Sequence, residues 1–185
     1  MSVFYRKFFL VFAISVAFSA IVSPVAAEQS FVIFDFRAAI AQSKAGKSMG
    51  SQIESQMKVV TDEAQKFDER FAGELEKLQE QRSLMAPDAL QSKAEELRLE
   101  QLKTQQDLSK RQRAIQAGGQ KATQEILKVA REELAAVAKE RNAALVISKE
   151  AIILNSPGLD VTKEVVSAMD KKLSSVKVKP IEVKE

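Results

Sequence analysis

The sequence predicts an α+β fold, mostly α, in which a long antiparallel helical hairpin projects from a small β-strand association domain. Apolar residues recur at heptad spacing through the middle of the chain, charged residues make up 29% of the sequence, and β-branched runs occur only towards its two ends. Such a share of charge suits long solvated helices better than a compact globule. With 185 residues, the chain is long enough for one domain of average size.

The composition excludes several classes of function. The chain contains no Cys, His or Trp, which rules out Ser-His-Asp and Cys-His triads, zinc fingers and thiol redox chemistry. No phosphate-binding loop occurs, and the acidic residues are spread along predicted helices instead of being paired in a rigid cleft. We therefore expect no catalytic residue, no cofactor and no metal site, and we assign no nucleic-acid partner.

The N-terminus has the three-part layout of a secretory signal peptide, which we assign to residues 1–27. Arg6 and Lys7 precede an apolar run, and small residues end at Ala27, so cleavage is expected before Glu28. An uncleaved membrane anchor is the alternative, because the run is only slightly short for a span. No later run has membrane length, so we expect a periplasmic protein without stable membrane insertion after cleavage.

The first element of the mature chain is a predicted strand. Residues 30–36 (SFVIFDF) are β-branched and aromatic with no helical period, which favours a buried strand. A short helix is expected over residues 37–43, ending near the break at Gly46.

The middle of the chain, residues 47–119, is predicted to be the hairpin, which we call the arm. Its first helix carries a heptad seam, and the helix is interrupted just before Pro87, a residue that can begin a helix but cannot continue one. The chain is therefore expected to reverse near residue 86. The second helix, over residues 87–141, has polar residues in its seam, so the pair should hold together loosely. The first seam consists of Ile53, Met57, Val60, Ala64, Phe67, Phe71, Leu75 and Leu78.

A pair of glycines lies at the base of the arm. With a reversal near residue 86, Gly118 and Gly119 should face Ile53 and Gln52 respectively, one turn from Gly50. Each glycine within a helix lowers its stability by about 1 kcal/mol relative to alanine, so the presence of two adjacent glycines requires an explanation. Close helix packing is one interpretation. A hinge that lets the arm swing is the other, and we assign Gly50, Gly118 and Gly119 as the candidate hinge.

The association domain is predicted to comprise residues 28–46 and 120–173. Beyond Gly119 a broad apolar stripe indicates packing into a core. Strands are expected at residues 144–148 and 151–154, and a last helix, capped by Asp160 or Thr162, is expected to end near Leu173. The polar and basic residues 174–185 are expected to be disordered.

Such a small core and its open strand edges predict oligomerisation through the strands. The candidate oligomerisation residues are Phe31, Val32, Ile33, Phe34, Leu145, Val146, Ile147, Ile152, Ile153 and Leu154.

Several motifs resemble the Skp (also called OmpH) family of periplasmic chaperones for outer membrane proteins. They are the opening strand VIFDF with Asp35, the S-x-x-G-K pattern of residues 43–47, the stretch VAKERNAALVIS at residues 137–148, and LDVTKEVV at residues 159–166. The resemblance covers nearly all of the mature chain. It implies a homotrimer with a small central barrel and three hairpins enclosing a cavity that holds unfolded outer membrane β-barrel proteins without ATP.

Two features of the arm bear on its partners. Residues 47–119 contain 12 basic and 13 acidic residues, so long-range attraction to anions should be weak, and we assign no lipopolysaccharide site. Phe67 and Phe71 are interpreted as hairpin core. The candidate client contacts are Leu84, Met85, Leu99 and Leu102.

Two other classes of protein remain as alternatives. An exported coiled-coil adaptor also carries a helical hairpin between β segments, but fewer than 20 residues precede the first long helix after the predicted cleavage site, too few for half of a sizeable β domain. An enzyme is disfavoured by the composition.

Overall fold

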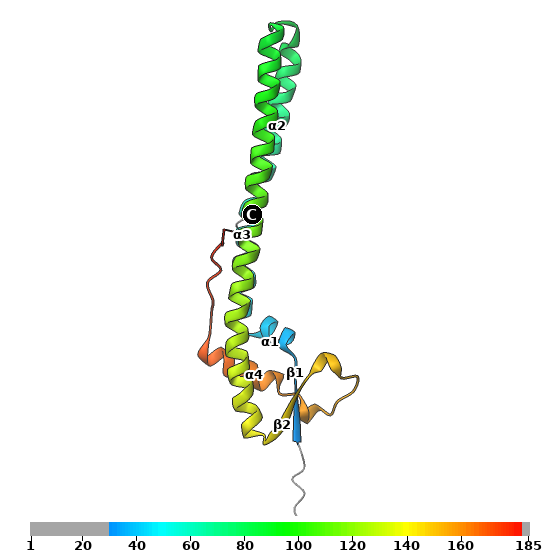
Figure 1. Cartoon of the computed structure of the whole chain (residues 1–185), viewed down its shortest axis with the longest axis vertical. Coiled ribbons are helices and arrows are strands. Elements are labelled where there is room, and N and C mark those ends of the chain that lie inside the picture. Colours follow the sequence, from blue (N-terminus) through cyan, green and yellow to red (C-terminus); the bar gives the residue numbers. More distant parts are fainter. Residues whose placement is uncertain (1–29, 183–185) are drawn as a thin grey trace, which may run out of the picture.

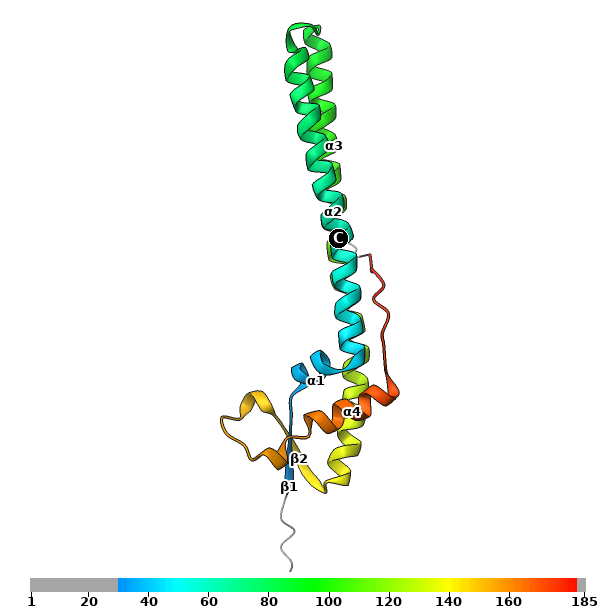
Figure 2. The same cartoon turned by 180° about the vertical axis from the view of Figure 1, so that it is seen from behind.

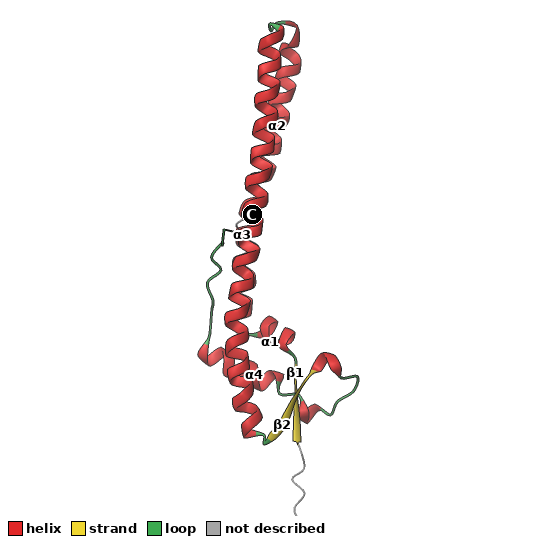
Figure 3. Cartoon of the chain, viewed as in Figure 1, coloured by secondary structure: helices red, strands yellow, loops and turns green. Residues whose placement is uncertain are grey.

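A computed structural model describes residues 30–182 of the chain. The predicted signal peptide, residues 1–27, lies outside this range. The molecule is a long helical hairpin standing on a small mixed base (Figure 1), and helices dominate it (Figure 3). No helix among residues 30–182 is long and apolar enough to cross a membrane.

The sheet of the base has two parallel strands. β1 (Ser30–Phe34) and β2 (Ala143–Ser148) pair with Val32 opposite Val146 and Ile33 opposite Ile147. On its other side, β1 is closed by the segment before the last helix, where the Val161 amide donates to the Ile33 carbonyl at 3.0 Å. Within the described residues, the outer edge of β2 has no strand beside it.

The expected third strand is wrong. Residues 149–151 form a short 3-10 turn, and the following Ile152, Ile153 and Leu154 lie in a loop. The physical reason is that an apolar run becomes a strand only beside another strand, and residues 30–182 offer no partner there.

Two caps fix the start of the helical part. The Asp35 carboxylate accepts from the Ala38 amide at 2.8 Å and so caps α1 (Phe36–Gln42). Ser43 caps α2 (Lys44–Glu80) by accepting from the Gly46 amide at 3.1 Å, while its hydroxyl donates to the Ile40 carbonyl at 3.0 Å. The S-x-x-G-K motif is thus the joint between two helices.

The hairpin follows the prediction closely. α2 ends in a 3-10 turn (Gln81–Ser83), and α3 (Pro87–Glu140) begins on the proline. Cross-hairpin ion pairs join Arg70 to Glu100 and Glu63 to Arg111, which is the register that a reversal near residue 86 requires. α3 runs unbroken through residue 119, and the left-handed Asn142 (φ 52°) turns the chain into β2.

The core lies where the lower part of α3 meets β1, α1 and α4 (Thr162–Lys172). Phe34 is fully buried and packs edge-on against Phe36, with ring centroids 4.6 Å apart. Along the upper part of the arm few side chains are buried. The largest buried members of the base are Phe34, Ile33, Ile126, Met169, Val161 and Val165.

The disorder predicted for the C-terminal residues is wrong for residues 174–182, here called the tail segment. The tail segment leaves α4 and runs back along the base of the arm (Figure 2). Val176 and Val178 are buried in the main core cluster. The segment is ordered for two reasons. Its apolar residues recur every second position, so an extended chain can bury one side, and polar side chains bond its backbone.

Asp160 makes the base sensitive to acid. Burial tends to raise the pKa of its carboxyl, but hydrogen bonds from Lys149 and Thr162 outweigh this and lower the pKa to about 2. Since the folded pKa lies below the unfolded value of 3.8, this stabilisation is present above pH 3.8 and is lost as the pH falls towards 2.

We therefore expect Asp160→Asn to lower the free energy of unfolding by about 1–2 kcal/mol at pH 7 and by much less near pH 2. Urea unfolding of both proteins across that range measures the difference. An equal loss at both pH values would contradict the assignment.

Candidate functional site

The first candidate surface is the outer face and edge of the sheet. Leu145 on β2 is 61% exposed, and Val146 and Phe31 are exposed beside it. In the loop after β2, Ile153 is 97% exposed and Leu154 nearly as much. Apolar side chains gathered at an unpaired strand edge are an unusual surface for a soluble monomer.

The predicted oligomerisation residues fall into two groups in the structure. Val32, Ile33 and Phe34 are buried inside the single chain and hold its own core. Ile147 and Ile152 are half-buried, and the remaining five are exposed. Only the exposed group is free to meet another chain: Phe31, Leu145, Val146, Ile153 and Leu154.

The second candidate surface is the arm. At the tip, Leu84 is 85% exposed and Met85 half-buried. Leu99 and Leu102 are exposed further down α3. Phe67 and Phe71 are half-buried and stack with centroids 5.5 Å apart, which agrees with a role inside the hairpin. The four candidate client contacts are therefore accessible but do not form one patch.

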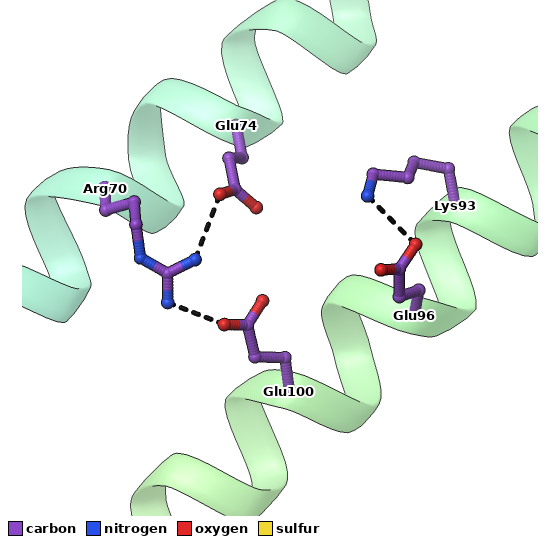
Figure 4. A network of polar contacts seen from close by, with 5 residues as sticks. All are labelled: Arg70, Glu74, Lys93, Glu96 and Glu100. Carbon is purple, nitrogen blue, oxygen red and sulfur yellow. Dashed lines mark hydrogen bonds and ion pairs between the residues drawn. The ribbon is translucent and has the colours of Figure 1, made fainter.

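The polar side chains of the arm pair with one another. Arg70 donates to Glu74 at 3.0 Å and to Glu100 across the hairpin at 2.6 Å, and Lys93 bonds Glu96 nearby (Figure 4). The bonds to Glu100 and Glu74 raise the pKa of Arg70. Of these three contacts only Arg70–Glu100 joins the two helices, and because all three are exposed they add little stability.

The structure shows what each hinge candidate touches. A side chain on Gly50 would meet open space, whereas one on Gly119 would lie 2.9 Å from Cδ1 of Ile53. A Cβ on Gly118 would overlap the Lys179 carbonyl oxygen, so this glycine faces the tail segment and not Ile53 as expected, and Ile53 lies beside Gly119 instead. Close packing therefore accounts for the pair, and the hinge role stays a prediction.

The two adjacent glycines allow a matched test of the tail segment. In Gly118→Ala the new Cβ lies 2.9 Å from the Lys179 carbonyl carbon as well as overlapping its oxygen, and backbone yields at high cost. We expect the end of the tail segment to detach, so that the Ile181 amide, which donates to the Ala114 carbonyl at 2.9 Å, exchanges at least about tenfold faster.

Gly119→Ala is the control, because it meets only the flexible end of Ile53. Each substitution gains about 1 kcal/mol of helix propensity, so general helix stability is matched. Hydrogen exchange with mass spectrometry over residues 174–182 reads out the difference. Equal exchange in the two variants would show that Gly118 does not seat the tail segment.

Sequence reasoning missed the glutamines that hold the tail segment. Gln52 and Gln56 lie one turn apart on α2 and bond the backbone of Val176 and Val178. Glutamine residues on a charged helix are usually solvent-exposed, so their presence did not predict a binding role. The V-x-V alternation near the C-terminus was the available sign that this segment packs against another part of the chain.

Comparison with known proteins finds similarity in sequence and in fold. A family model described as outer membrane protein (OmpH-like) matches residues 30–169, well over half of the chain. Among solved structures, a candidate outer membrane chaperone (OmpH-like) from Caulobacter crescentus CB15 is similar with a TM-score of 0.79 and 22% identity. The similarity covers 85% of this chain and 93% of that one. No curated protein matches the chain.

Proposed function

The chain belongs to the OmpH-like family of outer membrane proteins, and we propose that it acts as an ATP-independent periplasmic chaperone. In this proposal it binds unfolded outer membrane β-barrel proteins in a cavity between helical arms and prevents their aggregation. The observation that carries the proposal is the shape of the molecule, in which a long, thinly packed arm stands on a base with an exposed apolar strand edge.

The proposal includes a homotrimer. β2 has an open outer edge with Leu145 and Val146 exposed, and Ile153 and Leu154 extend the same kind of surface. Pairing of this edge with another chain would bury it and satisfy its backbone groups. The arms of three chains, joined at their bases, would then surround a common space.

Weak and dispersed contact is the proposed mode of holding. Leu84 and Met85 are accessible at the tip, and Leu99 and Leu102 are accessible further down α3, so a client would meet several small apolar contacts and no single strong one. The near balance of charge on the arm makes steric enclosure and apolar contact more important than attraction between charges. A pivot at Gly50, Gly118 and Gly119 would let the arms adapt to clients of different size.

Light scattering tests the proposal. A urea-unfolded outer membrane barrel is diluted into the chain from residue 28 onwards, without nucleotide. Suppressed scattering near one trimer per client, persisting in moderate salt, is the expected result. Scattering equal to that in buffer alone would overturn the chaperone proposal and favour an exported adaptor.

A further inference from the structure

The tail segment lies in a groove between α2 and α3 at the base of the arm, and it lies there as an extended chain. Val176 and Val178 point inwards and are buried, while Lys177 and Lys179 are exposed. The groove therefore accepts a chain whose apolar residues alternate with polar ones, the two-residue period of a β-strand.

Two glutamines of α2 bind the main chain of this segment. Gln52 donates from Nε2 to the Val176 carbonyl at 2.7 Å, and its Oε1 accepts from the Val178 amide at 3.0 Å. One turn further, Gln56 donates from Nε2 to the Val178 carbonyl at 2.9 Å. Because these bonds go to backbone atoms, they are independent of the side chains of the bound segment.

The series of bonds between these glutamines and the backbone lacks one member. By the pattern at Gln52, the Oε1 atom of Gln56 would accept from the amide two residues after Val178. That residue is Pro180, which has no N–H. The Gln56 Oε1 atom is accordingly buried without a hydrogen-bond partner among the described residues. Since a buried acceptor left unpaired weakens binding, the tail segment is an imperfect occupant of its own groove.

Beside Pro180, the residues that the structure describes leave part of the groove open. An adjoining pocket of about 270 Å³ is largely apolar, so it has room for another side chain of an occupant longer than the tail segment. It is lined by Gln56, Val59, Val60, Ala114, Ile115 and Pro180, together with Arg111 at its rim.

We propose that this groove is a binding site for an extended segment with alternating apolar residues, and that the tail segment is its exchangeable resident. The partner is a transmembrane strand of an unfolded β-barrel, since such strands alternate apolar and polar residues with period two. The inference rests on the proposed chaperone function and deepens it. A client already held by the arms reaches a high local concentration, so its strands can compete with the tethered tail segment.

The experiment uses the full mature chain with Lys177→Cys, an exposed position in a protein without other cysteines. A spin label at this cysteine reports whether the tail segment is seated. The first probe is a synthetic peptide of residues 174–182 with alanine in place of Pro180. The control peptide also carries aspartate in place of Val176 and Val178. A third peptide is a transmembrane strand from an outer membrane barrel.

The first and third peptides should mobilise the label, and the control peptide should not. In a labelled chain that also carries Pro180→Ala, the resident gains the missing bond, so the peptide concentration for half-release should rise about fivefold to tenfold. An immobile label at about 1 mM of the first peptide, or equal release by the control peptide, would overturn the proposal.

This test is separable from that of the holdase. If the chain suppresses scattering but no peptide mobilises the label, the proposal that the groove binds client strands is overturned and the proposed chaperone function is retained. A label that the first and third peptides mobilise, in a chain that does not suppress scattering, would support the groove and remove the chaperone function.

Discussion

We expect Leu145→Asp to convert the proposed trimer into monomers at micromolar concentration. In the single chain this side chain is 61% exposed on β2, so a carboxylate there costs the folded monomer little. At a strand-to-strand contact between chains it would be buried, and an unpaired buried charge costs several kcal/mol. Three copies of the contact would multiply the effect.

Size-exclusion chromatography with multi-angle light scattering measures the outcome. Leu75→Asp is the matched control, because Leu75 is 45% exposed but lies on the arm, away from the sheet. It should leave the assembly intact. If Leu145→Asp remained a trimer, the interface would not lie at β2. If the parent protein were a monomer at micromolar concentration, the proposed interface would not exist.

Gly46→Ala should destabilise the protein strongly. A Cβ at this position would overlap the Ile40 carbonyl oxygen and lie 2.7 Å from its carbon. The joint between α1 and α2 would have to open, and the cap from Ser43 to the Gly46 amide would be lost with it. We expect a loss of about 3 kcal/mol in the free energy of unfolding.

Gly50→Ala provides the comparison one turn further along the same helix. Nothing lies within 4 Å of a Cβ there, so the substitution should stabilise the protein by about 1 kcal/mol. Urea denaturation of the two variants gives opposite signs if the joint is as described. A mild effect of Gly46→Ala would mean that the two helices can move apart at little cost.

The arm was predictable because its information is local. The heptad seam predicted the first helix, and Pro87 marked the start of the second. The resulting register brings Arg70 beside Glu100, and it places Ile53 beside Gly119, one residue from the Gly118 expected there. Repeats and helix breakers act over a few residues, so sequence patterns report them well.

The errors concern contacts between distant segments. Residues 151–154 carry a strand composition, but no strand lies beside them in the described part of the chain. The polar composition of residues 174–182 suggested disorder, whereas the partners of Val176 and Val178 lie more than 100 positions earlier, on α2. Gly118 was expected to face Ile53 across the hairpin, whereas its neighbour is Lys179. Composition does not report such partners.

The central claim is that three chains together hold one unfolded barrel. Native mass spectrometry tests it most directly, with the chain from residue 28 mixed with a barrel diluted from urea in the absence of nucleotide. The account predicts one main complex whose mass equals three chains and one barrel. A complex of one chain with one barrel, or free chains beside aggregated barrel, would contradict it.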